Sequence, residues 1–483
     1  MTALLCACTV GPDYHRPQIA SPSNWSETAG LTTSSDEAQL ARWWGQFSDP
    51  VLDGLIARAL KTNLDLETAA SRVRQARFQE SEAKAAQWPS IKAMGDAATL
   101  NSNRTSGGAS SGASGSGGAP AGAGFALPSH LNLYSAGFDA SWEIDIFGGV
   151  RRSIEEAKAN SEAAVWARRD AEVTLTAEIA SDYFALRQIQ ARLALGRGEL
   201  ARQNEIGALV GARHRAGFVT NFDVNQQTGV ITSAAAQLHQ LEGEERVQIH
   251  ALAILVAEPP ESLEPELTQP RALPVSPPSL PVGLPSDLIR RRPDVREAER
   301  RLAAANAEIG VQTANLYPKL DLIGLASFAS TSLGNLFSTA NLTSAALGMA
   351  SEPLFDAGKT RAAIRAAREG AVQADLTWRK TVLVSFRDVE DALARYRSEQ
   401  ERQLQLTQAV GATQNSLAIA RDQYQVGLVT FANVYSAELA EMNARDQLVQ
   451  SQAAAATDLV SLYKALGGGW SVWVQAGGTP ARP

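Results

Sequence analysis

The pattern of apolar and polar residues divides the chain into very long helical runs and short alternating runs. No proline occurs between Pro128 and Pro259 or between Pro353 and Pro480, and both intervals are rich in Ala, Leu, Gln, Arg and Glu. The stretch from Gly149 to Arg215 alone would form a helix roughly 100 Å long at about 1.5 Å per residue. Helical runs of this length are typical of coiled coils and are rare in globular domains.

The long run occurs twice, with the same landmarks in each copy. It opens at Gly148 and again, 210 residues later, at Gly358, and the first helix of each copy closes at a glycine, Gly217 or Gly427. Glycine supplies the positive φ that ends a helix, so each copy is predicted to be an antiparallel helical hairpin. A repeated order of landmarks at a fixed offset indicates a duplicated structural unit.

A shorter helix precedes each hairpin. It is predicted at Leu64–Gln87 and again at Asp294–Tyr317, and a proline stops both copies because proline disfavours the α conformation in the preceding residue. The offset here is 229 residues rather than 210, so the first copy carries 19 extra residues. Their source is Ser106–Gly124, which is almost entirely Gly, Ser and Ala and is typical of a flexible loop.

Alternating runs between the short helix and the hairpin predict β-strands. The best is Tyr134–Asp145, with a partner starting near Ile91, and the second copy is expected to have strands at Leu320–Ala329 and about Ala345–Phe355. Such strands fit a soluble sandwich with one packed face, or a membrane barrel whose polar face meets a water-filled lumen. In a barrel, the polar face of the first run would place four residues towards the lumen: Asp139, Ser141, Glu143 and Asp145.

The number of strands has a consequence for assembly. Four strands per chain cannot close a barrel, and open sheet edges are not tolerated in lipid. If these strands span a membrane, several chains must contribute. Three chains would give about twelve strands, an even number in the usual range.

Composition narrows the functional classes. The net charge of −7 argues against nucleic acid as a partner. No run of 18 or more apolar residues occurs, so the sequence predicts no transmembrane helix. Five scattered His and four Met leave little for a metal site, and no cofactor is expected. Gly358-Lys359-Thr360 looks like the end of a phosphate-binding loop, but Pro353 stands where that motif needs glycine. The sequence does not indicate an enzyme.

The first residues fit the processing site of bacterial lipoproteins. In Leu5-Cys6-Ala7-Cys8, small residues separate a leucine from a cysteine, which gives a peptidase access to the chain. Lipid on the Cys8 thiol would anchor the protein in a leaflet. An apolar start with accidental cysteines is the alternative. The seven residues before Cys8 lack a basic region and do not form a complete signal peptide, so a late or trimmed start is expected.

Several short segments form a specific set when they are taken together. They are Val10–Pro17, Trp43–Trp44, Trp142–Gly148, Leu288–Asp294 and Pro353–Gly358. Together they resemble the TolC-like outer membrane efflux family, in particular its lipoprotein (OprM/NodT-like) branch. The resemblance runs from Cys8 to about Trp470.

The resemblance implies an α+β membrane protein with an internal duplication. In that fold, four strands from each chain of a homotrimer form a 12-stranded β-barrel in the bacterial outer membrane, continuous with a long α-helical barrel in the periplasm. The implied function is the passive exit duct of a tripartite efflux pump. The implied partners are a periplasmic adaptor protein, an inner-membrane transporter of the proton-driven (RND) type, and outer membrane lipid.

On this interpretation the chain divides into consecutive segments. They are 1–7 (signal and lipobox remnant), 8–48 (lipid-anchored arm), 49–89 (periplasmic helices of the first repeat), 90–147 (two strands and the Gly/Ser-rich external loop), 148–258 (first long hairpin), 259–285 (proline-rich linker), 286–317 (helix of the second repeat), 318–356 (two further strands), 357–466 (second long hairpin) and 467–483 (C-terminal tail).

The resemblance places the functional end at the hairpin tips, which narrow the entrance and meet the adaptor. The gate candidates are Gly217, Leu417, Arg421, Asp422, Tyr424 and Gly427. The candidates for adaptor contact are Arg213, Arg215, Val219, Thr220, Gln425, Leu428, Val429 and Thr430. The hydroxyls of Thr220 and Thr430 are also expected to cap the helices that follow them.

Two gate candidates depart from the family pattern. Leu417 and Arg421 are four residues apart and share a helix face, so three copies could form an apolar ring beside a charged ring. The family commonly has an acidic residue at the constriction, whereas alignment on Gly427 puts Arg421 there, with Asp422 next to it. The alternative for Arg421 and Asp422 is that they lie on an ordinary solvated helix surface.

Two other functions stay open at this point. An exit duct for type I protein secretion would share the architecture but carry another substrate, and the lipobox and Val10–Pro17 favour efflux over it. A non-channel periplasmic coiled-coil scaffold would explain the helices but neither the strand pairs nor the lipobox. The substrate itself is not indicated, although the few Met and His disfavour a dedicated copper or silver duct.

Overall fold

The structure is a computed structural model that describes residues 9–28, 40–101, 130–273 and 285–470 of the 483-residue chain. Cys8, the Gly/Ser-rich segment Ser106–Gly124 and the tail 471–483 lie outside the described residues. The chain forms two compact units: Met1–His15, Arg77–Ala159 and Ala303–Val372 form the first, and Arg16–Ala76, Asn160–Leu302 and Gln373–Pro483 form the second. Both units therefore draw on both repeats.

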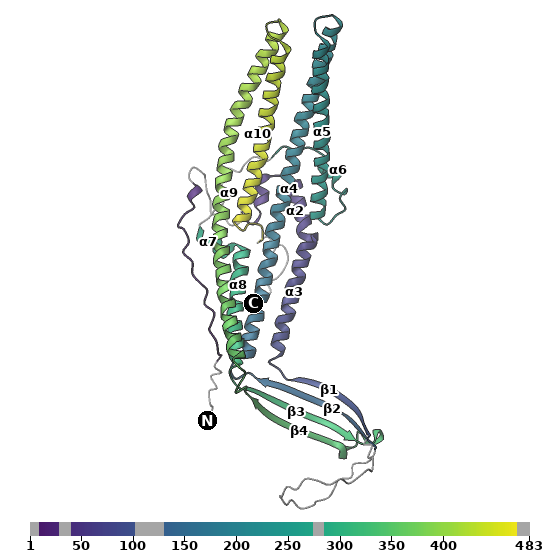
Figure 1. Ribbon diagram of the computed structural model, residues 1–483, viewed down its shortest axis with the longest axis vertical. Coiled ribbons are helices and arrows are strands. Elements are labelled where there is room, and N and C mark those ends of the chain that lie inside the picture. Colours follow the sequence, from purple (N-terminus) through teal and green to yellow (C-terminus); the bar gives the residue numbers. More distant parts are fainter. Residues whose placement is uncertain (1–8, 29–39, 102–129, 274–284, 471–483) are drawn as a thin grey trace, which may run out of the picture. The chain divides into compact units, whose positions relative to one another are not determined.

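A four-stranded antiparallel sheet dominates the first unit (Figure 1). Its strands are β1 (Ser90–Asn101), β2 (His130–Ile144), β3 (Lys319–Ser330) and β4 (Leu342–Ser351), in the order β1-β2-β3-β4. All four expected strands are present. The last strand ends at Ser351 rather than near 355, because the chain meets Pro353, which cannot donate a ladder hydrogen bond.

The register gives the sheet two different faces. Residues that lie directly opposite one another on neighbouring strands point to the same face. Lys92 lies opposite Asp139, and Glu143 lies opposite Asp321. By this rule every Lys, Asp and Glu of the four strands lies on one face, which we call the charged face: Lys92, Asp96, Asp139, Glu143, Lys319 and Asp321. The opposite, uncharged face carries Phe138, Trp142 and Leu322, all of them exposed.

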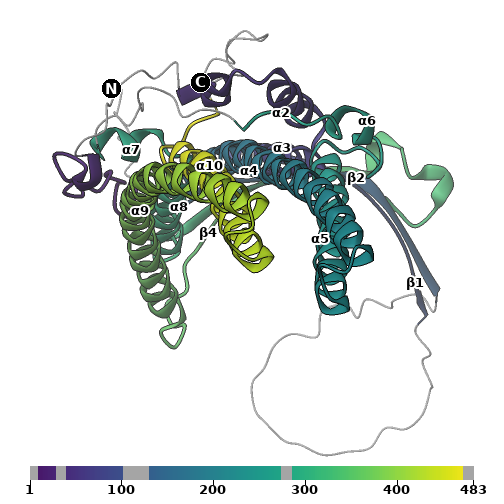
Figure 2. The ribbon, with the colours of Figure 1, turned by 90° about the horizontal axis from the view of Figure 1, so that it is seen from above.

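Two pairs of long helices repeat with equal lengths. The first pair is α4 (Gly149–Arg215) and α5 (Asn221–Leu255), and the second is α9 (Lys359–Gln425) and α10 (Phe431–Ala465). The first helix of each pair has 67 residues and the second has 35. In two views α5 lies beside α4, and α10 beside α9 (Figures 1 and 2). The predicted duplicated hairpins are confirmed.

Shorter helices complete the chain. They are α2 (Pro50–Thr62), α3 (Leu64–Ala85), α6 (Glu264–Leu267), α7 (Pro285–Arg291) and α8 (Pro293–Ala314), with 3-10 turns at Ser26–Thr28, Trp43–Phe47, Leu333–Asn335 and Thr339–Asn341. Asn63 separates α2 from α3, and its side-chain oxygen accepts a hydrogen bond from the Leu66 amide at 3.0 Å. The side chain supplies one of the acceptors that a new helix lacks, so the chain can restart a helix there.

An aspartate caps the start of α4 and of α9, the two 67-residue helices. The Asp145 carboxylate accepts hydrogen bonds from the amides of Val150 (3.1 Å) and Arg151 (2.9 Å). The Asp356 carboxylate accepts from the Thr360 amide and hydroxyl, and these bonds lower the pKa of Asp356 to about 2. Asp145 lies just past the end of β2, so the expectation that it points into a barrel lumen is wrong. The first-turn amides of a helix hold its carboxylate instead.

Aromatic residues from distant segments build the core of the second unit. The Trp43 side chain is fully buried and stacks on Tyr463, with ring centroids 5.1 Å apart. Phe47 packs edge-on against Phe184 of α4 at 4.8 Å. In the N-terminal arm (8–48), Trp25 is buried and contacts Phe386 of α9. The arm is therefore fixed to the helices by burial of large rings.

Candidate functional site

Glycines shape the tips of both hairpins. Gly217 has φ +80° and Gly427 has φ +77°, the left-handed conformation that the sequence predicts at the helix ends. The next residue of each tip donates its amide back to the helix, Phe218 to the Arg213 carbonyl and Leu428 to the Gln423 carbonyl, both at 2.9 Å. The side chains of Phe218 and Leu428 are 81% and 76% exposed. Phe222 at the first tip and Val426 at the second are also exposed, at 73% and 72%, so each tip presents two large apolar side chains.

The two threonines of the tips start the following helices in different ways. The Thr220 amide and hydroxyl both donate to the Asp223 carboxylate at 2.9 Å, and these bonds lower the pKa of Asp223. The Thr430 hydroxyl donates to the Asn433 side-chain oxygen at 2.8 Å. Thr220 and Asp223 form a capping box at the start of α5, in which the Thr220 side chain also accepts the Asp223 amide, so the expected cap is confirmed at this tip. The Thr430 side chain makes no cap hydrogen bond with an amide of α10.

One aromatic contact joins the two hairpins near their tips. The Arg213 guanidinium of α4 lies 4.6 Å from the ring centroid of Tyr424 of α9, in cation–π geometry. Tyr424 also meets Phe431 of α10 edge-on, at 5.9 Å between centroids. The structure thus brings together one adaptor-contact candidate and one gate candidate.

A buried polar cluster connects the four long helices below the tips. The Glu438 side chain of α10 is 1% exposed and accepts hydrogen bonds from Arg421 of α9 at 2.6 Å and from Gln203 of α4 at 3.0 Å. Gln203 also donates to Glu199 at 2.5 Å, and Gln227 of α5 donates to the Gln203 carbonyl at 2.9 Å. We call Gln203, Gln227, Arg421 and Glu438 the inter-hairpin cluster.

Sequence reasoning identified only Arg421 of this cluster. The other three residues stand in Ala- and Leu-rich helices, where the sequence does not tell which helix faces meet. A polar residue on a helix surface and one buried between helices give the same pattern when the packing partner is unknown. The ion pair with Glu438 holds the Arg421 guanidinium against another helix of the same chain.

The other tip candidates lie in different environments. Leu417 is 8% exposed within the single chain, so little of its side chain is left to form an apolar ring, because neighbouring helices already cover it. The exposed candidates are Arg215, Thr220, Asp422, Gln425, Leu428 and Thr430, and the half-buried ones are Arg213, Val219, Tyr424 and Val429.

Three of the four lumen candidates share the charged face of the sheet. Asp139 and Glu143 lie there with Ser141, whose hydroxyl is 2.8 Å from that of Ser90 on β1. The Glu143 carboxylate is 3.9 Å from the Lys319 ammonium, and both side chains are about half exposed. Such an exposed pair is weak and leaves the face open to other ions.

A cradle in the first unit holds the residues that follow Cys8. The Val10 amide donates to the Phe147 carbonyl, and the Arg152 guanidinium donates to the Val10 carbonyl, both at 3.1 Å. Arg152 also binds the Asp13 carboxylate at 2.8 Å, and its side chain is only 4% exposed. A Cβ on Gly310 would stand 2.6 Å from the Arg152 side chain, so this close approach needs a glycine.

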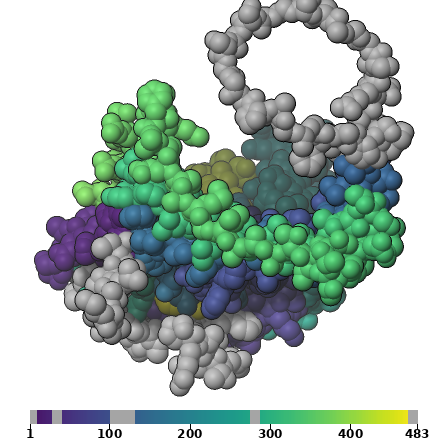
Figure 3. Space-filling model, turned by 90° about the horizontal axis from the view of Figure 1, so that it is seen from below, coloured from purple at the N-terminus to yellow at the C-terminus, as the bar shows by residue number. Residues whose placement is uncertain are grey.

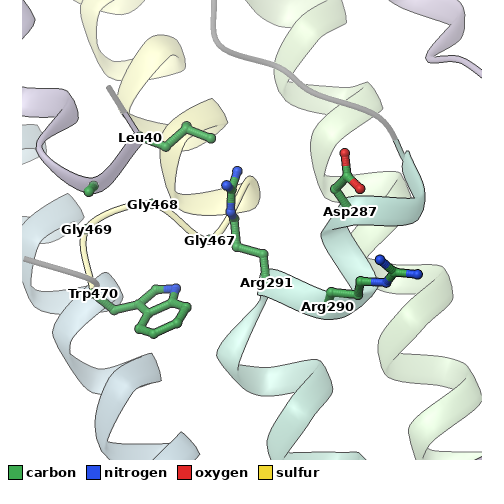
Figure 4. Close-up of a pocket in the computed structure, with 9 residues that line it drawn as sticks. Leu40, Asp287, Arg290, Arg291, Gly467, Gly468, Gly469 and Trp470 are labelled. Atoms are coloured by element: carbon green, nitrogen blue, oxygen red, sulfur yellow. The ribbon is translucent and has the colours of Figure 1, made fainter. Parts of the chain in front are cut away.

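A hollow in the second unit is lined by Leu40, Ala41, Asp287, Arg290, Arg291, Gly467, Gly468, Gly469 and Trp470, and has a volume of about 330 Å³ (Figure 4). Arg290 and Arg291 come from α7, and Trp470 follows the glycines after α10. The Arg169 guanidinium lies 4.6 Å from the Trp470 ring centroid and 4.3 Å from that of Trp166. These side chains stabilise one another and offer no nucleophile with a neighbouring base.

Within the residues that the structure describes, no helix is long and apolar enough to cross a membrane. In the same described segments, no group of three or more His, Cys, Asp or Glu side chains could hold a metal ion.

Comparison with known proteins identifies the family. The model of the outer membrane efflux protein family matches residues 55–257 and 284–468. The chain is 32% identical over 475 residues to the pyoverdine export outer membrane protein OpmQ of Pseudomonas aeruginosa, a match that covers 97% of this chain and 95% of that protein. It is 30% identical over 469 residues to nodulation protein T of Rhizobium leguminosarum bv. viciae, covering 97% and 92%.

A solved structure shares the fold over nearly the whole chain. The structure of the outer-membrane channel OprN aligns with a TM-score of 0.86 and 31% sequence identity, and covers 96% of this chain and 100% of that one. The family match includes parts of both repeats, from α2 to the end of α10. The chain belongs to the outer membrane efflux protein family.

Proposed function

We propose that this chain is one subunit of a homotrimeric outer membrane channel, the exit duct of a tripartite efflux pump. The observation that carries the proposal is the sheet, which has an uncharged face and a charged face and two outer strands that pair on one side only. An uncharged face suits lipid, and a charged face suits a water-filled lumen.

The edges of the sheet support a barrel built from several chains. In the described residues, β1 pairs only with β2, and β4 only with β3, so each outer strand leaves one row of backbone groups unpaired. Every residue of β4 is exposed, and the space-filling view from below shows the green surface of the strand region uncovered (Figure 3). Lipid cannot satisfy unpaired backbone groups, so β4 of one chain would pair with β1 of the next. Three chains close the barrel with about twelve strands.

The duct would act by gated passage and without covalent chemistry. Arg421, Asp422 and Tyr424 stay gate candidates, with Gly217 and Gly427 as the turns that shape the tips. A periplasmic adaptor would bind the exposed tip residues, and an inner-membrane transporter would supply the solute. Phe218 and Leu428 are apolar anchors for such a contact, because large exposed apolar side chains recover free energy when a partner buries them.

A lipid on Cys8 would anchor each subunit to the membrane. The cradle supports this idea, because Arg152 and the Phe147 carbonyl fix the residues after Cys8 beside the start of α4, just beyond the end of β2. Mass spectrometry of the mature N-terminus tests it, and an unmodified Cys8 would remove the anchor from the proposal.

Conductance after reconstitution into planar bilayers tests the channel itself. Purified protein should form ion-conducting pores, and native mass spectrometry should give three times the chain mass of 51.3 kDa. A scaffold passes no current, so a folded protein without conductance contradicts the proposal.

Channels formed by the Arg421→Ala and Asp422→Ala variants test the gate. If their conductance equals that of the wild type, neither residue belongs to the gate.

The kind of cargo has its own test. A gene for an adaptor and an inner-membrane transporter beside this one would support efflux. A neighbouring gene for a secreted protein would favour the type I secretion duct instead.

A further inference from the structure

One end of the charged face combines two carboxylates with an apolar patch. Glu143 of β2 lies directly opposite Asp321 of β3, which in turn lies opposite Met349 of β4. The next row on the same face contains Ile323 and Leu347. Leu347 and Met349 are 57% and 52% exposed, so this patch is uncovered in the chain.

The carboxylates of this row attract cations. Like charges directly opposite one another destabilise a strand pair, and a cation between them removes the repulsion. Lys319 supplies part of this positive charge, since its ammonium is 3.9 Å from the Glu143 carboxylate. Among the described residues, none forms an ion pair with Asp321. One carboxylate of the row is therefore left for a cation from solution.

The apolar residues beside the carboxylates define the rest of the ligand. On a face that meets water, Ile323, Leu347 and Met349 gain free energy if an apolar body covers them. The opposite and diagonal neighbours of such a sheet are about 5 to 8 Å apart, so one fused-ring molecule reaches both the carboxylate row and the patch. A hollow of about 210 Å³ at the same end of the sheet has Glu143 and Lys319 in its lining.

We infer that this end of the charged face is a low-affinity binding site for amphiphilic cations in transit. The cation is held by Asp321 and Glu143, and the apolar body by Ile323, Leu347 and Met349. The inference rests on the proposed function, because it takes the charged face as the lumen face. A weak site of this kind concentrates apolar cations at the end of the barrel where β2 leads into α4, and it lets them leave again.

The test uses the reconstituted full-length channel with rhodamine 6G, an amphiphilic cation, as blocker of the ionic current. Asp321→Asn and Met349→Gln should each raise the half-blocking concentration about fivefold or more, because one removes a charge and the other an apolar contact. Tetraethylammonium, which has the charge without the fused rings, should respond to Asp321→Asn but not to Met349→Gln.

The sheet supplies matched controls. Asp96 and Met94 lie on the same charged face, on β1, opposite Ser135 and Gly137, which are eight and six residues along β2 from Glu143. Asp96→Asn and Met94→Gln should leave the half-blocking concentration of rhodamine 6G within about twofold of the wild type, since they change the same chemistry elsewhere. If they shift it as much as the patch variants do, the effect is that of the whole lumen charge or polarity, and the site is refuted.

The outcomes separate this inference from the proposed function. If Asp321→Asn and Met349→Gln channels conduct and rhodamine 6G blocks them as it blocks the wild type, the site does not exist while the channel stands. If folded wild-type protein does not conduct, the proposed function fails and the site fails with it. If Asp321→Asn does not assemble, Met349→Gln and its control Met94→Gln decide alone.

Discussion

The two helical hairpins have the same lengths but very different surroundings. At equivalent positions, 210 residues apart, Val173 of α4 is 3% exposed and Leu383 of α9 is 61% exposed. Arg187 is fully buried in the first copy, whereas the side chain of Arg397 in the second is 43% exposed. Duplication copied the backbone, and the packing of each copy then diverged. The second hairpin leaves apolar side chains open, which suits a face that another copy of the chain covers.

The largest expected difference is between the two equivalent arginines. Arg187 donates to the Gln269 carbonyl at 2.8 Å and to Gln190 at 2.5 Å, and no water replaces these bonds at a fully buried site. Arg187→Met should lower the free energy of unfolding by about 3 kcal/mol. Arg397→Met removes only exposed ion pairs and should cost less than about 0.5 kcal/mol. Thermal melting of the purified proteins, followed by circular dichroism, measures both, and equal losses would contradict the comparison.

The inter-hairpin cluster gives the next largest difference. Glu438 is 2% exposed and holds Arg421 and Gln203, whereas Thr228, its equivalent in the first copy, is exposed. Glu438→Ala should cost about 2 kcal/mol because buried polar partners lose their acceptor. Thr228→Ala is the control and should cost less than about 0.5 kcal/mol. Denaturant unfolding measures both variants. A Glu438→Ala variant that unfolds at the same denaturant concentration as the wild type would show that the inter-hairpin cluster does not stabilise the fold.

The open face of α9 predicts an effect on assembly rather than on the single chain. Leu383→Ser should weaken association of the subunits by about 1.5 kcal/mol per chain, because a partner no longer buries the leucine. Val173→Ala, at the equivalent position, should instead lower the melting temperature through loss of core packing. Native mass spectrometry at decreasing protein concentration measures the first effect. A trimer fraction unchanged by Leu383→Ser would show that another surface joins the chains.

The smallest expected effect is a pH dependence at Glu156 of α4, which the equivalent position of α9 lacks. Burial and a hydrogen bond with Glu308 raise the pKa of Glu156 from 4.5 to about 7, while Ala366 stands at the equivalent place in α9. The folded state then binds more protons than the unfolded state, so stability falls as the pH rises from 4.5 to 7. Glu156→Gln should gain about 1 kcal/mol at pH 8, less than the full shift implies because the carboxyl is half-buried.

At pH 4 the same variant should match the wild type, since this pH lies below the pKa of the Glu156 carboxyl in both the folded and the unfolded state. Melting curves at the two pH values check the sign. A gain at pH 4 as large as that at pH 8 would point to better packing of the glutamine rather than to its lack of charge.

Much of the fold was predictable because local patterns carry it. Gly217 and Gly427 end the long helices where the sequence predicts, and the strand around Trp142 has the predicted alternation. Asp145 was misplaced because the alternation continues one residue beyond β2, and only the start of α4 shows that its carboxylate caps a helix. The chemistry of the tips was less predictable, since Arg421 pairs with a residue 17 positions away on another helix.

The sequence by itself determined the duplication, the hairpins, the strands and the face of β2 that carries charge. These features depend on periods of 3.6 and 2 residues and on glycine and proline, whose preferences act within a few residues. Only the tertiary structure decided which copy of each repeated position is buried, as at Arg187 and Arg397, and which polar residues meet in the inter-hairpin cluster. Burial depends on contacts between segments far apart in the chain, and a repeated local pattern is the same whether or not such a partner is present.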